Sequence, residues 1–169
     1  MQFNAYGTDG FNKIFNDASQ LWDVLKEDKV LFKENIERNI RKICDQVAQT
    51  KLGITRWGCE GHPELIHKDG SNYDEGEGYI FIIAKDRDSS SKLLEILHYA
   101  YTDIAEEWGW DFTPLIEADV ATIDSDNTYP VIIVRTPVLL TKTIRNTWWR
   151  SMTTSFKHHA KGYKSNANV

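Results

Sequence analysis

Apolar residues in the first third of the chain recur at steps of three and four, which is the spacing of one face of an α-helix. The first such stripe predicts a helix over residues 9–27, formed by Phe11, Ile14, Phe15, Ala18, Leu21, Trp22 and Leu25. The second predicts a helix over residues 30–51, with Phe32, Ile36, Ile40, Ile43 and Val47 facing inward. Because only two residues separate the predicted helices, we expect an N-terminal helical hairpin over residues 1–51.

The period of the pattern changes after residue 51. Short apolar or alternating segments predict five strands, at 52–57, 64–67, 79–84, 115–123 and 130–135. A helix is predicted over 91–108, between the third and fourth strands. A last helix is predicted over about 137–158, because Thr136 can cap it and Pro137 suits its first position. Its inward stripe is Leu140, Ile144, Trp148, Met152 and Phe156.

This order of elements predicts an α+β fold with a small antiparallel or mixed sheet of about five strands. The sheet would carry one internal helix and a C-terminal amphipathic helix. The 169 residues suit one domain, which we place at 1–156. We divide it into the helical hairpin at 1–51, a sheet region at 52–136 and the last helix at 137–156. A basic tail at 157–169 follows.

Charge is distributed very unevenly along the chain. The whole chain has a net charge of −5, whereas residues 60–126 contain 17 acidic and four basic residues, a net charge of −13. Residues 127–169 contain seven basic residues and no acidic one. Such asymmetry indicates a charged partner or self-association, because opposite fields raise encounter rates and select an orientation. Acidic loops that fold against a basic helix of the same chain would account for part of it.

The C-terminal segment combines basic and aromatic residues, and we predict that it binds a partner. The predicted contacts there are Arg145, Trp149, Arg150, Lys157, Lys161, Tyr163 and Lys164. We expect Trp149 to be exposed, because it lies a quarter-turn from the inward stripe. The matching acidic contacts are Asp74, Glu75 and Glu77, in a loop rich in turn-forming residues. The same segment suits an acidic protein or single-stranded nucleic acid, although a sequence pI of about 5.5 disfavours a dedicated nucleic-acid binder.

One set of residues has the composition of a zinc site. Cys59, His62 and His67 lie in and beside a predicted turn, and thiolate and imidazole are zinc ligands. A structural site needs a fourth ligand from elsewhere in the fold, whereas a catalytic site needs only three, with Glu60 or Glu64 as the base. The alternative is that Cys59 packs inside and both histidines are ordinary loop residues.

Other catalytic classes lack their motifs. The acid-x-Lys pair of two-metal nucleases is missing, because Ile83 precedes Lys85 and Ile66 precedes Lys68 by two residues. No G-x-S-x-G, phosphate loop or zinc-deaminase pair occurs. The acidic loop that begins at Asp69 has Asp74 where a calcium-binding EF-hand needs glycine.

These features favour a non-enzymatic interaction or assembly module, such as a viral structural component or an inhibitor or immunity-type protein. The alternative is a metal-dependent hydrolase or nucleic-acid-processing enzyme with a Cys/His zinc site. Two cysteines are too few for a disulfide scaffold, so we expect a cytoplasmic protein, or one of the virion or host cytoplasm. No apolar run is long enough to span a membrane, and we expect no membrane partner.

Overall fold

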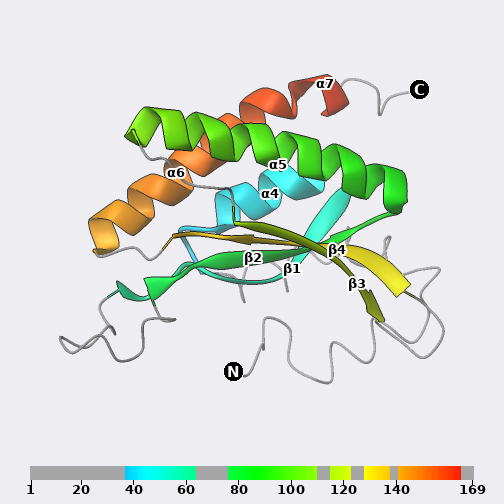
Figure 1. The fold of residues 1–169 in the computed structure, drawn as a ribbon, viewed down its shortest axis with the longest axis horizontal. Coiled ribbons are helices and arrows are strands. Elements are labelled where there is room, and N and C mark those ends of the chain that lie inside the picture. The colour runs from blue at the N-terminus through cyan, green and yellow to red at the C-terminus, as the bar shows by residue number, and fades with distance from the viewer. Residues whose placement is uncertain (1–36, 64–75, 110–114, 123–127, 138–140, 165–169) are drawn as a thin grey trace.

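The structure is a computed structural model that describes residues 37–63, 76–109, 115–122, 128–137 and 141–164 (Figure 1). The predicted helix at 9–27 and the predicted strand at 64–67 lie outside these residues. The described elements are α4 (Arg41–Gln49), β1 (Gly53–Cys59), β2 (Tyr79–Ala84), α5 (Arg87–Trp108), β3 (Ile116–Thr122), β4 (Thr128–Arg135), α6 (Lys142–His159) and α7 (Lys161–Lys164). They confirm the mixed α+β class.

The four described strands form one sheet in the order β1-β2-β4-β3, and every neighbouring pair is antiparallel. The two continuous apolar segments of the sequence became the central strands β2 and β4, as expected for strands with a neighbour on each side. Gly53 pairs with Ala84 at one end of the β1–β2 ladder, and Cys59 pairs with Tyr79 at the other. These two ends hold the features with the clearest chemistry.

The helices α4, α5 and α6 cover one face of the sheet (Figure 1), and α6 packs against both α4 and α5. The sheet presents alternate side chains to them, because successive residues of a strand point to opposite faces. The largest fully buried side chains are Trp148, Trp149, Tyr101, Phe156, Ile40, Ile43, Ile80, Ile82, Leu93, Ile96 and Leu97. The predicted inward residues of the helices at 30–51, 91–108 and 137–158 therefore form much of this core.

Helix α6 begins later than the sequence indicates. Its N-cap is Thr141, whose hydroxyl accepts the N–H of Ile144 at 3.2 Å, so a helix start at Pro137 was wrong. Thr136 instead extends the sheet: its N–H donates to the carbonyl of Gly78 at 2.8 Å, and its hydroxyl accepts the N–H of Gly78 at 2.7 Å. A long-range pairing thus replaced the local capping signal.

The boundary predicted at residue 157 does not separate a tail from the fold. Helix α6 runs on to His159, Ala160 is fully buried, and the ring of Tyr163 in α7 packs against the core. Among the described residues, no helix combines the length and the apolar character that crossing a bilayer requires.

Candidate metal centre

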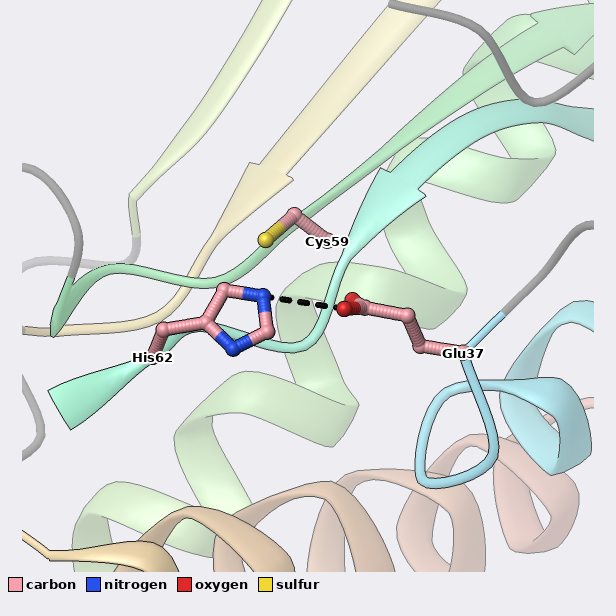
Figure 2. Close-up of side chains that lie close together, drawn as sticks. All are labelled: Glu37, Cys59 and His62. Atoms are coloured by element: carbon pink, nitrogen blue, oxygen red, sulfur yellow. Dashed lines mark ion pairs between the residues drawn. The ribbon is translucent and has the colours of Figure 1, made fainter. Parts of the chain in front are cut away.

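Three potential metal ligands of different types converge at the Cys59 end of the β1–β2 ladder. Glu37 precedes α4, Cys59 is the last residue of β1, and His62 lies in the turn that follows. One ligand atom from each residue lies within 4.8 Å of the other two. Figure 2 shows the thiol, the imidazole and the carboxylate at the corners of a triangle, with one imidazole nitrogen facing the carboxylate of Glu37. These three residues are therefore a group that could hold a metal ion.

The turn after β1 depends on Gly61. Its φ of 85° is a left-handed conformation that other residues adopt at a cost, and a Cβ there would lie 3.0 Å from both the carbonyl oxygen of Gly76 and the amide nitrogen of Gly78. This conformation aims the Gly61 N–H at the Sγ of Cys59, 3.4 Å away. An N–H that donates to sulfur stabilises its thiolate form, which is the form that binds metal.

Both carboxylate oxygens of Glu37 are held in place. One forms an ion pair with Nε2 of His62 at 2.9 Å, and the other accepts the backbone N–H of Glu60 at 2.6 Å. Burial raises the pKa of Cys59 to about 11; the Gly61 N–H opposes this rise, and the nearby carboxylates add to it. A bound cation would reverse this effect, because it favours the thiolate.

A buried ion pair supports the turn from behind. Nη2 of Arg145 lies 3.0 Å from Oε1 of Glu60, and both side chains are nearly buried, at 6% and 12% exposed. The other carboxylate oxygen of Glu60 accepts two bonds from Asn39, at 2.8 and 3.1 Å. Nη1 of Arg145 donates to the carbonyl of Gly61 at 2.8 Å, and Nε1 of Trp149 donates to the carbonyl of Glu60 at 2.9 Å. The backbone that carries the ligands is therefore fixed by side chains of α6.

The charges of this region favour a divalent cation. With Cys59 as thiolate, the two carboxylates and the sulfur contribute three negative charges and Arg145 contributes one positive charge. A dication would balance the remaining charge of −2. Cysteine, histidine and carboxylate are together a zinc ligand set, since hard cations such as calcium prefer oxygen alone.

The structure brings together two of the three predicted metal ligands, Cys59 and His62. The third, His67, lies outside the described residues. Glu37 was not among the predicted ligands, because it lies far upstream of Cys59 and the apolar pattern places it on the outer face of the predicted helix at 30–51. Only the fold places it beside Cys59.

The residues predicted to bind a partner fall into three groups. Arg150, Lys157 and Lys161 are exposed, whereas Tyr163 and Glu77 are half-buried. The predicted exposure of Trp149 was wrong: it is 0% exposed, because it bonds to the turn after β1. Arg145, also a predicted contact, bonds to the same turn and is 5% exposed. Asp74, Glu75 and the side chain of Lys164 lie outside the described part of the chain.

Comparisons of the chain with protein-family models, with curated proteins and with solved structures found no match.

Proposed function

We propose that this protein is a non-enzymatic assembly module whose fold is locked by a zinc centre. The convergence of Glu37, Cys59 and His62 within 4.8 Å carries the zinc part of the proposal. The sorting of exposed charge among the helices supports the assembly part. The two free cysteines, Cys44 and Cys59, support a reducing, cytoplasmic setting.

A structural role for zinc fits the site better than a catalytic one. The three ligands come from the segment before α4 and from the end of β1 with its turn, so one ion would join these segments. Glu60, the carboxylate that could act as a general base, has both oxygens bound by Arg145 and Asn39. The predicted ligand His67 is the natural candidate for the fourth position.

The zinc centre is tested by metal analysis of protein loaded with excess zinc and then desalted. We expect one zinc ion per wild-type chain and a loss of at least ten-fold in Cys59→Ala and in His62→Ala. Cys44→Ala and His98→Ala are the matched controls, because they remove a thiol and an imidazole elsewhere and should keep the zinc. A wild-type chain that retains no zinc would contradict the proposal.

Exposed charge is sorted across the helical layer. On one side, α6 and α7 carry the exposed cations Arg150, Lys157 and Lys161 and contain no acidic residue. By contrast, the C-terminal half of α5 exposes Glu106 and Glu107, and β3 exposes Glu117 and Asp119. Because α6 lies beside α4, its Lys157 shares a groove of about 340 Å³ with Lys42 and Asp45. Opposite charges on two different surfaces of one chain favour head-to-tail contact between copies.

Light scattering coupled to size exclusion tests the assembly. Raising the salt from about 50 to about 500 mM shortens the screening length from about 14 to about 4 Å. We therefore expect an oligomer at low salt that dissociates at high salt. The variant Lys42→Glu/Lys157→Glu should be monomeric at both salts, whereas Lys142→Glu, an exposed site at the far end of α6, should behave as wild type. A wild-type monomer of 19.5 kDa at both salts would exclude self-association.

One observation favours the second candidate function, a metal-dependent hydrolase. The side chains of Glu37 and His62 are 36% and 32% exposed, so a substrate could reach an ion held there. The zinc-loaded protein would then cleave bis(p-nitrophenyl) phosphate, and Cys59→Ala would abolish the cleavage. Zinc-loaded protein that shows no such cleavage would exclude the hydrolase and favour the structural role of zinc.

A further inference from the structure

A second group of charged side chains surrounds a cavity at the opposite end of the β1–β2 ladder. The cavity has a volume of about 680 Å³ and lies between the end of α4, the start of α5 and α7. Its described lining is Thr50, Lys51, Leu52, Lys85, Ser89, Lys92, Gly162 and Tyr163. Three of these residues are lysines and none is acidic, in contrast to the net charge of the whole chain.

Each lysine reaches the cavity from a different element. Lys51 follows α4, Lys85 follows β2, and Lys92 lies in the second turn of α5. Charge patterning along the sequence hides this group, because Lys85 and Lys92 belong to the strongly acidic middle segment. Asp86, the N-cap of α5, lies close to two of the lysines: its pKa is lowered chiefly by hydrogen bonds from Ser89 and also by Lys85 and Lys92. No carboxylate belongs to the described lining, so the charged side chains that line the cavity there are all cationic.

Lys51 adopts a backbone conformation that suits glycine. Its φ is 60°, and it is the only residue other than glycine with a positive φ in the described part of the chain. At the position after a helix this conformation is usually met by glycine, which pays no penalty for it. Lys51 therefore lines the cavity from a backbone conformation that costs stability.

We propose that this cavity binds the phosphate groups of a small phosphorylated molecule. Three ammonium groups around one space can neutralise a diphosphate, and the positive end of the α5 dipole adds to their field. The volume lies in the range of about 300–1,000 Å³ that is typical of small-molecule sites. Leu52 and the half-buried ring of Tyr163 provide an apolar wall for the rest of the ligand. This site lies at the opposite end of the β1–β2 ladder from the zinc centre.

Calorimetric titration with adenosine diphosphate tests the site. We expect saturable binding that Lys85→Gln/Lys92→Gln weakens at least ten-fold. Lys42→Gln/Lys157→Gln is the matched control, because it removes two lysines that also line a groove, and it should weaken binding less than two-fold. Adenosine, which has no phosphate, should not bind. Equal weakening by both double variants, or no saturation below about 1 mM, would overturn the proposal.

Lys51→Gly separates binding from folding. Glycine relieves the strained backbone, so this variant should melt at a higher temperature while it binds adenosine diphosphate at least three-fold more weakly. A purely structural lysine would give the first effect without the second. Unchanged affinity in a stabilised variant would therefore contradict the assignment.

Two further ligands identify the source of the phosphate. Fructose 1,6-bisphosphate has two phosphates and no ring to stack on Tyr163; binding equal to that of adenosine diphosphate would assign the site to phosphate alone. Tighter binding of the nucleotide that Tyr163→Ala removes would assign it to nucleotides. Single-stranded dT12 that binds when neither small ligand does would overturn the proposal and indicate nucleic acid instead.

Discussion

The two ends of the β1–β2 ladder handle charge in opposite ways. At the Cys59 end, the side chains of Glu60 and Arg145 are nearly buried, and they neutralise each other at 3.0 Å. At the Gly53 end, Lys85 and Lys92 stay exposed around an open cavity. The first arrangement fixes the backbone of the turn after β1, whereas the second leaves positive charge available to bind an anionic ligand.

The two ends also differ in how they affect the stability of the fold. The Cys59 end gains rigidity, since four side-chain bonds hold the carboxylate and carbonyl of Glu60. The Gly53 end keeps a strained Lys51 and like charges close together, both of which oppose folding. We therefore expect a ligand to bind at the Gly53 end.

The largest expected effect comes from breaking the buried pair. Arg145→Met leaves the carboxylate of Glu60 buried without its cation, which should lower the free energy of unfolding by about 3–5 kcal/mol. Arg150→Met removes an exposed arginine from the same helix and should change it by less than about 0.5 kcal/mol. Urea unfolding measures both. Equal losses in the two variants would mean that the Cys59 end does not depend on this pair.

The next effect concerns the turn that carries the metal ligands. Gly61→Ala places a Cβ 3.0 Å from two backbone atoms at a φ of 85°, so we expect a loss of about 1–3 kcal/mol together with reduced zinc retention. Gly162→Ala is the control at the other end, because a Cβ there meets no atom within 4 Å. Thermal melts and metal analysis give the two readouts. A Gly61→Ala chain that melts as wild type would show that the turn tolerates a side chain.

At the lysine end, the cap of α5 should contribute less. The carboxylate of Asp86 accepts the N–H of Ser89 at 2.7 Å, so Asp86→Ala should cost about 1 kcal/mol and Asp86→Asn only a few tenths. The pKa of Asp86 is lowered in the fold, so its extra stability is present at neutral pH and is lost as pH falls through that lowered pKa. Unfolding of wild type and Asp86→Asn from pH 7 to pH 2 should therefore converge in acid. Curves that stay parallel would contradict this sign.

The smallest effect lies between α5 and α6. Asp103 pairs with His159 at 2.8 Å and accepts a hydrogen bond from Ser155. The side chain of Asp103 is 49% exposed and that of His159 is 25% exposed. Burial raises the pKa of Asp103, but these bonds and the histidine charges lower it by more, so the pKa of Asp103 lies below its usual value. Water screens such a pair, so a double-mutant cycle of Asp103→Asn and His159→Gln should give only about 0.2–1 kcal/mol. A coupling above about 2 kcal/mol would place an important anchor here rather than at Arg145.

The sequence predicted best those elements that depend on local pattern. The run at residues 79–84 became β2 without a shift, because a continuous apolar segment between glycine and charged residues has few other ways to be buried. The inward positions Ile40, Ile43 and Val47 are fully buried, because their helical spacing places them on one apolar face. The helix cap was predicted less well: Thr136, predicted to cap the last helix, instead bonds to Gly78 beside the sheet.

The site depended on contacts that no local pattern contains. The spacing of Cys59 and His62 indicated zinc, but Glu37 joins them only because α4 packs beside the end of β1. Trp149 lies outside the apolar stripe of α6 and is buried by a second surface, the turn after β1. The three lysines of the cavity come from three elements, so their grouping required the fold.

Chemical shifts of backbone amides test the contrast between the two ends most directly. We would titrate separate samples of the nitrogen-15-labelled protein with zinc and with adenosine diphosphate. The account predicts that zinc shifts the amides of Asn39, Glu60 and Gly61, and that the nucleotide shifts those of Lys51, Ser89 and Gly162. Shifts at the same amides for both ligands, or none that saturate for either, would contradict it.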